Sequence, residues 1–337
     1  MKFGKKFRNI IAILACALVL CGCEDLAAVS DAAFGLGGTG PGTAAETAAF
    51  TVPETESVTK DTAESVSSES TASFLAVHYV DVGQGDCTLI ECGGEYMLID
   101  AGDNDKGTLV QSYLLSHGVT SLKYFIITHS DADHCGGADV IMTKFPCGTV
   151  FIKKEERDTS TYRDVWDTIN YLGINAVSPA VGDTYTLGGA SFAVLGPAAD
   201  YDTPNDNSIA ILLAYGECRF LFTGDAEGPE EQAIIDCGID ISGIDVYKCG
   251  HHGSSTSSGA GLLDAACPKN AVISCGEGND YGHPSAATLN SLRERGVNVY
   301  RTDEQGTVVA VSDGSSVGFS CPPSETWKAG EAKQTYY

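Results

Sequence analysis

The sequence predicts an α/β domain in which two β-sheets are flanked by helices, and three observations support this fold class. Short strand-like runs, FLAVHYVDV, CTLIEC and YMLIDAG, follow one another from residue 74 and are separated by glycine-rich turns. Helical and strand-like stretches then alternate up to about residue 312. Several apolar runs end directly on residues that can bind metals. The opening favours an antiparallel meander, and the later alternation favours two sheets with helices packed on them over a single parallel sheet.

Hydrophobic periodicity places the remaining elements. Helices are expected over residues 108–117, 136–145, 161–172, 229–237 and 284–295. Strands are expected over residues 124–128, 148–153, 191–195, 208–215, 218–223, 244–249, 270–275, 297–301 and 307–312. The folded domain is therefore expected over residues 74–320, with a loose C-terminal tail at residues 321–337.

The N-terminal residues have the order of a secretory signal. Four basic residues, between Lys2 and Arg8, precede an apolar run from Ile10 to Leu20 that is too short to span a membrane as a helix. The run ends in Leu-Cys-Gly-Cys, which resembles a bacterial lipobox, so we expect residues 1–22 to be removed and Cys23 to be acylated. Residues 23–73 are mostly Ala, Thr, Ser, Gly and Glu, which predicts a flexible tether. This arrangement would anchor the domain by a lipid at the extracellular face of the cell membrane.

The densest polar motif follows the apolar run YFIIT. It is THSDADHCGG at residues 128–137, and it contains His129, Asp131, Asp133 and His134. Nitrogen and carboxylate ligands in one loop at a strand end can converge on two adjacent cations. The motif therefore predicts a centre with two divalent metal ions.

Three later loops contribute further candidates. LFTGD ends on Asp225, whose carboxylate suits a bridge between two metals, although taken alone it could equally cap the next helix. VYKCGHHGS contains His251 and His252, and adjacent side chains on an extended backbone point in different directions. We therefore expect one of these histidines to bind metal and the other to face substrate. NDYGHP presents His283 in a loop before a predicted helix.

These motifs, in this order, resemble a known family. HxDxDH, TGD and GHHGS, preceded by VDVGQGDCTLIECGGEYMLIDAG and accompanied by NDNS at residues 205–208, resemble the metallo-β-lactamase superfamily. The likeness is strongest to the hydrolase domain of ComEC-type competence channel proteins, and it covers roughly residues 76–312. It implies an αββα sandwich with a dinuclear metal site at the edge where the two sheets meet.

The resemblance also implies roles for the motif residues. One metal would be bound by His129 and Asp131, the other by Asp133, His134 and His251, and both by a bridging Asp225. Asp131 replaces the usual second histidine, as in the competence group, and this harder ligand shifts the preference from zinc towards manganese or magnesium. The expected cofactors are two divalent metal ions, either zinc or manganese.

The same resemblance identifies one departure and several substrate contacts. The superfamily histidine between HxHxDH and TGD has no counterpart, and Asp206 is the nearest candidate to replace it. Its neighbours Asn205, Asn207 and Ser208, together with Ser254, are expected to bind substrate. Asp133 is expected to orient the attacking water. The groups available to hold a phosphate oxygen or protonate the leaving group are Lys248, His252 and His283.

Two metals that activate a water support hydrolysis at phosphorus or at a carbonyl carbon. The first hypothesis is a phosphodiesterase or nuclease that acts on nucleic acid, nucleotides or wall polymers. The net charge of −25 argues against tight binding of long nucleic acids, which normally requires a basic track. A second hypothesis is a lactone, lactam or other carboxyl-ester hydrolase, which Asp131 disfavours. A third is a non-catalytic binding lipoprotein, which the complete ligand set disfavours; the sequence indicates no protein partner.

Overall fold

A computed structural model of the chain describes residues 74–332. The predicted signal sequence, Cys23 and the tether at residues 23–73 lie outside the described residues. Within the described range, no helix combines the length and the apolar character needed to cross a membrane.

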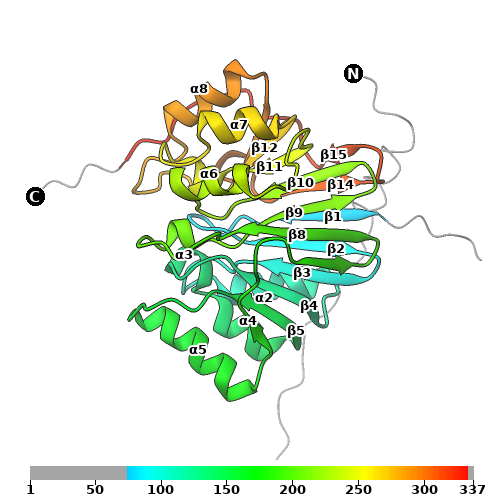
Figure 1. The fold of residues 1–337 in the computed structure, drawn as a ribbon, viewed down its shortest axis with the longest axis vertical. Helices are drawn as coiled ribbons and strands as arrows, with labels where there is room; N and C mark the ends of the chain where they lie inside the picture. Colours follow the sequence, from blue (N-terminus) through cyan, green and yellow to red (C-terminus); the bar gives the residue numbers. More distant parts are fainter. Residues whose placement is uncertain (1–73, 333–337) are drawn as a thin grey trace, which may run out of the picture. The chain divides into compact units, whose positions relative to one another are not determined.

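Two mixed β-sheets form the centre of the described domain (Figure 1). The first has, in spatial order, β15 (Val317–Phe319), β14 (Val308–Ser312), β1 (Leu75–Tyr79), β2 (Thr88–Cys92), β3 (Glu95–Ile99), β4 (Leu122–Ile127), β5 (Cys147–Ile152) and β6 (Ala176–Val177). Strands β1, β2 and β3 pair antiparallel, which confirms the predicted meander, and β3 to β6 are parallel. The first strand also pairs with β14, so the beginning and the end of the domain meet in one sheet.

The second sheet also combines antiparallel and parallel strand pairs. Its spatial order is β13 (Asn298–Arg301), β12 (Asn270–Ile273), β11 (Val246–Lys248), β10 (Cys218–Phe222), β9 (Ala210–Tyr215), β8 (Ala190–Gly196) and β7 (Thr184–Leu187). Strands β7 to β10 are antiparallel and β10 to β13 are parallel. Parallel strands align their carboxyl ends, so the loops after β10 and β11 leave the sheet at the same edge.

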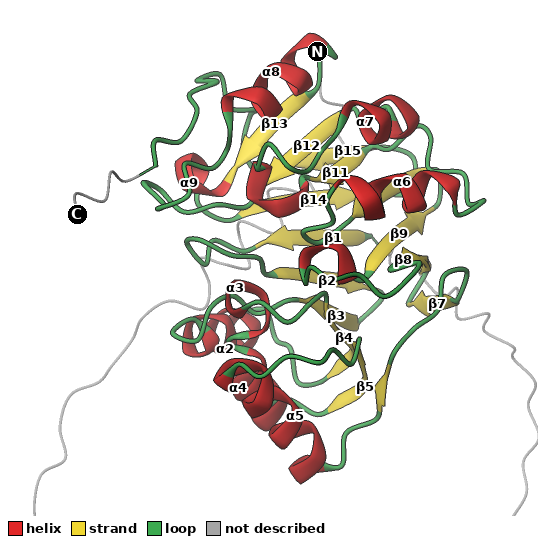
Figure 2. Cartoon of the chain, turned by 60° about the vertical axis from the view of Figure 1, so that its left-hand side comes forward, coloured by secondary structure: helices red, strands yellow, loops and turns green. Residues whose placement is uncertain are grey.

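Helices cover the outer face of each sheet. One group contains α2 (Gly107–Ser116), α3 (Ala132–Cys135), α4 (Ala138–Lys144) and α5 (Ser160–Leu172). The other contains α6 (Gly228–Asp236), α7 (Ala260–Ala266) and α8 (Ala286–Glu294), followed by the short α9 (Thr302–Gln305). Figures 1 and 2 show the two groups on opposite sides of the paired sheets. The predicted αββα sandwich is confirmed.

Three apolar clusters hold these layers together. Side chains such as Tyr79, Phe192 and Phe220 fill the space between the two sheets. A second cluster joins the first sheet to α2, α4 and α5, and a third joins the second sheet to α6, α7 and α8. Both faces of each sheet are covered, which explains why strands such as β9 are apolar almost without interruption. Full burial of each large aliphatic side chain contributes about 1.5–3 kcal/mol before the entropy of ordering is subtracted.

The structure departs from the predicted elements in short segments. Strands β6, β7 and β15 and helices α3, α7 and α9 were not expected; α7 is one short AGLLDAA stretch among Gly and Ser residues. Residues 321–332 contain neither helix nor strand, yet they pack against the domain. The Gly330 amide donates to the Pro284 carbonyl at 2.9 Å, and the Arg293 guanidinium lies 4.6 Å from the ring centre of Trp327. The described part of the predicted loose tail is therefore held in place.

Candidate metal centre

The loop after β4 presents the HxDxDH residues, and Asp100 at the end of β3 organises it. Its carboxylate accepts hydrogen bonds from the backbone amide and the hydroxyl of Thr128, both at 2.8 Å. The same carboxylate accepts a hydrogen bond from Nδ1 of His134, also at 2.8 Å. A carboxylate on Nδ1 fixes the ring orientation and leaves Nε2 free to face a metal.

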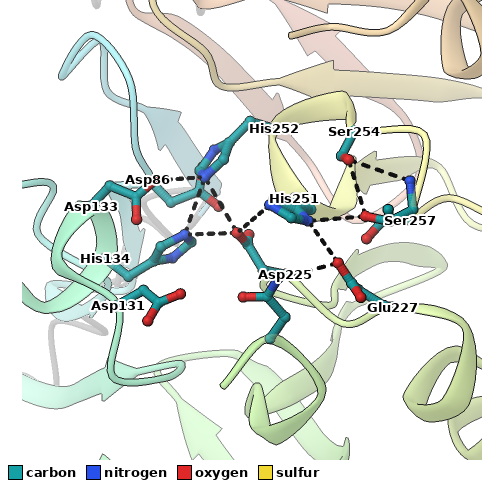
Figure 3. A network of polar contacts seen from close by, with 12 residues as sticks. Asp86, Asp131, Asp133, His134, Asp225, Glu227, His251, His252, Ser254 and Ser257 are labelled. Carbon is teal, nitrogen blue, oxygen red and sulfur yellow. Dashed lines mark hydrogen bonds and ion pairs between the residues drawn. The ribbon is translucent and has the colours of Figure 1, made fainter. Parts of the chain in front are cut away.

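Asp225 lies where the candidate ligands converge, in the turn that follows β10. Its Oδ2 is 3.2 Å from Nε2 of His134 and 3.4 Å from Nε2 of His252. Its backbone amide donates to the hydroxyl of Ser208 at 3.0 Å, which fixes the turn that carries it. Figure 3 shows the Asp225 carboxylate directed at both histidine rings.

The two adjacent histidines after β11 occupy different environments. His252 is buried, and its Nε2 lies 3.1 Å from Oδ2 of Asp133 and 3.2 Å from Nε2 of His134. The His251 side chain is 23% exposed; its Nδ1 lies 3.2 Å from Glu227, and its Nε2 is 3.8 Å from Asp225. The backbone here is left-handed, with φ of 49° and 54°, and not extended as expected from the sequence. The structure thus places His252 inside the cluster and His251 at its rim, although the family resemblance implied that His251 would be the metal ligand.

The donor set fits divalent metal ions. Ligand atoms of Asp86, His134, Asp225 and His252 all lie within 4.8 Å of one another, and all four residues are buried. Across the described residues, His129 Nε2, Asp86 Oδ1 and Asp225 Oδ1 are buried without a hydrogen-bond partner. Leaving such an atom unpaired costs about 1–3 kcal/mol, so buried polar atoms normally have partners. Imidazole nitrogens and carboxylate oxygens without partners are the ligands that zinc and manganese accept.

The carboxylates of this cluster are held in their ionised form. Burial alone would raise the pKa of Asp225, but the charges of His134 and His252 outweigh burial and hold it well below its usual range. Burial opposes ionisation of Asp133 too, and the hydrogen bond from His252 and the nearby histidine charges lower its pKa. Both residues therefore present anionic oxygens to the centre.

His129 and Asp131 lie next to this cluster. Nε2 of His129 is 3.8 Å from Oδ2 of Asp131, and Nδ1 of His129 is 3.4 Å from the hydroxyl of Ser208. The Asp131 side chain is partly exposed and accepts a hydrogen bond from Arg157 at 2.8 Å. The ring centre of His129 lies 4.2 Å from that of His134, so the pair borders the cluster, as a second metal site would require.

Lys248 and His283 were expected to act on substrate, but Lys248 is buried in an ion pair and His283 lies beside the cluster. Lys248 is 3% exposed, and its ammonium donates to Asp86 at 2.7 Å and to the Cys249 carbonyl at 3.0 Å. It is therefore not directed at a surface cleft, where a group that holds a phosphate oxygen would have to lie. The ring of His283 lies 5.4 Å from that of His251, and burial together with the charge of His252 lowers its pKa to about 4. His283 is therefore a neutral base next to the cluster.

Most of the NDNS segment has structural partners. Asp206 accepts hydrogen bonds from the Glu227 and Glu230 amides at the start of α6, so it is not directed at the cluster as a replacement ligand. Asn207 accepts from Lys153 and donates to the Tyr201 carbonyl.

The remaining expected substrate contacts also have protein partners. Asn205 donates to Glu227, and the Ser254 hydroxyl lies 3.0 Å from that of Thr256. Among the expected contacts, only the Ser208 hydroxyl lies next to a candidate metal ligand within the described residues.

Asp86 joins the cluster although no sequence pattern predicted it. It is the last residue of the GQGD turn between β1 and β2, which the sequence presents as a simple connection. Its backbone amide donates to the Asp133 carbonyl at 3.0 Å, so the turn is attached to the metal-binding loop. A carboxylate at the end of a glycine-rich turn was the available signal, and only the tertiary fold reveals its neighbours.

A cavity of about 580 Å³ opens beside the cluster. Its walls include Asp131 and Asp133, three further acidic residues and the exposed ring of Tyr281. The further acidic residues are Asp103, Glu277 and Asp280. None of the described residues that line it is Lys or Arg.

Comparison with known proteins agrees with this geometry. The family model described as "Metallo-beta-lactamase superfamily" matches residues 80–277. ComE operon protein 3 of Bacillus subtilis (strain 168) is 30% identical over 255 residues, which cover 69% of this chain and 32% of that protein. Competence protein ComA of Neisseria gonorrhoeae is 29% identical over 240 residues, which cover 69% and 32% respectively. The chain thus spans about a third of the length of these curated relatives.

A solved structure gives a more distant match. Igni18, a metallo hydrolase from Ignicoccus hospitalis KIN4/I, has 17% sequence identity and a TM-score of 0.45, with 69% of this chain and 98% of that chain covered. The family model spans more than half of the chain, and its range includes the turn of Asp86, the loop of His134 and the strand ends that carry Asp225 and His252. From the arrangement of these ligands and this match, the chain belongs to the metallo-β-lactamase superfamily of metal-dependent hydrolases.

Proposed function

We propose that this hydrolase is a phosphodiesterase that uses two divalent metal ions and acts on small or wall-attached phosphodiesters. The observation that supports it best is the convergence of carboxylate-rich, partly unpaired ligands beside an open cavity. Three carboxylates contribute to the two sites, and hard oxygen ligands suit the metals that commonly assist phosphoryl chemistry. The names of the competence and recombination proteins among its relatives also suggest a link to nucleic acids.

The residues divide into two sites in this proposal. One ion would be held by Asp133, His134 and His252, and the other by His129 and Asp131. Asp225 would contribute one carboxylate oxygen to each. When bound, such ions acidify water and neutralise the charge that develops on phosphoryl oxygens. Zinc or manganese satisfies these ligands, and the carboxylate at Asp131 favours manganese.

The chain's own groups then orient the reactants. Asp133 lines the cavity and accepts a hydrogen bond from the attacking water, which adds to phosphorus while the bond to the leaving alcohol breaks. The water passes its proton to the neutral base His283 beside the cluster, and the leaving oxygen takes up a proton from solvent in the open cavity. Tyr281 stacks on His283 with ring centres 5.7 Å apart, so its exposed ring forms a wall for the leaving group.

The charge of the cavity supports a small substrate. Five carboxylates and no Lys or Arg are found among its described lining residues, so a polyanion would be repelled outside the reach of the metals. A single phosphodiester with a neutral or cationic leaving alcohol fits better, as in nucleotide or choline esters of a wall polymer.

The location of the enzyme is part of the proposal. The LCGC motif after the apolar run supports acylation at Cys23 and attachment to the outer face of the membrane by its lipid. Substituting Cys23→Ala should abolish metabolic labelling with a radioactive fatty acid, whereas Cys21→Ala should leave labelling intact. Continued labelling of Cys23→Ala would contradict the assignment.

The reaction itself can be tested with metal-stripped protein reloaded with manganese or zinc. We expect hydrolysis of bis-p-nitrophenyl phosphate, weaker cleavage of single-stranded DNA, and no cleavage of a chromogenic lactam. Asp133→Asn should keep the fold. Substitution of a residue that only supports a metal ligand typically costs roughly 10- to 100-fold in activity, and the loss in Asp133→Asn should be larger. A lactam cleaved faster than the diester, or an Asp133→Asn variant with normal turnover, would overturn the proposal.

A further inference from the structure

Asp86 and Lys248 form a buried ion pair that the proposed reaction does not use. Asp86 ends the turn between β1 and β2, and Lys248 is the last residue of β11, so the pair links the two sheets. The Lys248 ammonium lies 2.7 Å from Oδ2 of Asp86, and the side chains are only 3% and 7% exposed. The free energy of desolvating two buried charges often exceeds the gain from their attraction. A contribution to stability therefore does not explain why the chain contains this pair.

The second oxygen of Asp86 provides that explanation. Oδ1 lies 3.2 Å from Nδ1 of His252, and no hydrogen-bond partner satisfies it. The same Nδ1 lies 3.1 Å from the Ser274 carbonyl, which accepts its hydrogen. The opposite nitrogen, Nε2, is the one that faces Asp133, His134 and Asp225. Asp86 therefore approaches the ring nitrogen of His252 that does not face the other ligands, although one of its oxygens still lies within 4.8 Å of ligand atoms of His134 and Asp225.

A related arrangement, in which the carboxylate itself accepts the hydrogen bond, occurs at the other buried histidine of the cluster. Asp100 accepts a hydrogen bond from Nδ1 of His134, while Nε2 of His134 faces Asp225. Carboxylates placed behind metal-binding histidines fix the ring and increase its basicity as a ligand. Two histidines from different sheets thus each have a carboxylate behind them.

We infer that Asp86 is a positioning residue for His252 as a metal ligand, and that Lys248 acts only by holding Asp86 in place. The inference rests on the proposed metal centre, but it does not depend on which substrate is hydrolysed. The turn is well suited to this role, because its backbone is bonded to Asp133 and a Cβ at Gly85 would overlap the Asp133 carbonyl. Movement of Asp86 is therefore restricted by the loop that bears the other ligands.

A double-mutant cycle tests the pair on the full chain. The four proteins are wild type, Asp86→Asn, Lys248→Met and the double variant, each stripped of metal. Manganese affinity is measured by calorimetry without substrate, bound ions are counted by elemental analysis, and cobalt absorption reports the ligand field. Asp86→Asn should weaken affinity about 10- to 100-fold and change the cobalt spectrum while both ions still bind. Lys248→Met should weaken affinity too, and the double variant should be no worse than Asp86→Asn.

Lys269→Met is the matched control. It removes an ammonium that lies 2.7 Å from Asp245 on the same sheet, but this lysine is 68% exposed and precedes β12, at the opposite end of the parallel strands from the metal-binding loops. It should change neither metal affinity nor the cobalt spectrum.

Three results would overturn the inference. Additive losses in the double variant would show that Lys248 does not act through Asp86. Loss of one bound ion in Asp86→Asn would make Asp86 a direct ligand. An increased KM with unchanged metal affinity in Lys248→Met would make Lys248 a substrate-binding group.

The cycle remains informative if Lys248→Met fails to fold. That variant leaves Asp86 buried without its partner, whereas the double variant contains neither charge. Equal metal affinities of the double variant and Asp86→Asn would then still show that Lys248 acts through Asp86. Since affinity is read without substrate, absence of phosphodiesterase activity in the wild type would overturn the proposed function and leave this test intact.

Discussion

His251 and His252 are neighbours in sequence with opposite surroundings, and this difference predicts different consequences of the same substitution. His252→Gln should lose one bound ion and reduce turnover by at least about 10- to 100-fold, because its Nε2 faces three other candidate ligands. His251→Gln is the matched control and should retain both ions, since its ring is engaged with Glu227 at the rim. Elemental analysis and turnover on a diester measure both effects. Loss of an ion in His251→Gln alone would reverse the assignment.

Sequence could locate this site but not choose between the two histidines. His129, Asp131, Asp133 and His134 lie within one loop, so a local motif was enough to predict them. Alternation along an extended backbone predicted only that the two rings point apart, and the choice of His251 came from the family resemblance; the positive φ at both residues removes that alternation. Asp86 is brought to the site by strand pairing and by the packing of two loops, which no local pattern encodes.

Glu230 predicts a pH dependence of stability. It is fully buried in α6, and burial raises its pKa from 4.5 to about 7. Because the folded state favours the protonated acid, this contribution to stability is complete below about pH 4.5 and is lost as the pH rises through 7. The Glu230→Gln variant should therefore be more stable than wild type at pH 8, by an amount on the order of 3 kcal/mol at most.

Urea unfolding at pH 5 and pH 8 measures this effect. Glu294→Gln, at an exposed position of α8, is the control and should shift neither curve. Equal stability of Glu230→Gln and wild type at both pH values would contradict the raised pKa.

At the scale of elements, the metal-binding loop depends on close backbone packing. A Cβ at Gly136 would overlap backbone atoms of Asp103 and Asn104, and one at Gly137 would overlap the Ala101 carbonyl. The two glycines therefore let α3 and α4 approach the loop after β3, which carries Asp100. The glycine pair that follows HxDxDH is explained by this contact.

Gly136→Ala should therefore damage both the fold and the site. Backbone atoms cannot rotate away as a side chain can, so we expect destabilisation of about 1–3 kcal/mol or more and weaker metal binding. Gly228→Ala, where an added Cβ meets nothing within 4 Å, is the control and should be close to neutral. Thermal unfolding of the metal-free proteins separates the effect on the fold from that on binding. Normal stability of Gly136→Ala would show that the loop can relax.

The elements that sequence placed well are those with long periodic patterns. Helix α5 has Thr159 as its N-cap, which accepts a hydrogen bond from the Tyr162 amide, and Gly173 at φ 64° as its end. Both signals are local, and the expected range of 161–172 differs by one residue from the observed helix. The segment at residues 321–332 is held by single contacts, such as that between Trp327 and Arg293. Single contacts leave no periodic pattern in the sequence, so this packing was not predicted.

At the scale of the whole molecule, charge predicts how binding responds to salt. The chain has a formal net charge of −25, and the cavity walls that are described contain no Lys or Arg. Recognition of one phosphodiester at the metals should depend weakly on salt, because only contacts within a Debye length of ~8 Å contribute at physiological ionic strength. A polymer nuclease should instead show a log-log slope of about −0.7 per neutralised phosphate on single strands.

Binding of the Asp133→Asn variant to oligonucleotides of increasing length, at several salt concentrations, distinguishes the two cases. We expect weak binding that changes little with length. Affinity that increases with length and collapses with salt would indicate a local basic groove and favour a nuclease that acts on long strands.

The pairing of β1 with β14 has a consequence for biosynthesis. β1 is made first among the described strands, and it pairs on one side with β2 as soon as the hairpin forms. Its other side, opposite Ala310 and Val311, stays without a partner until nearly all of the domain has been synthesised. An unpaired, apolar strand edge is a template for association between chains. A nascent or truncated chain that lacks β14 is therefore expected to need protection by chaperones, and folding is completed only when the last strands close the sheet over the first.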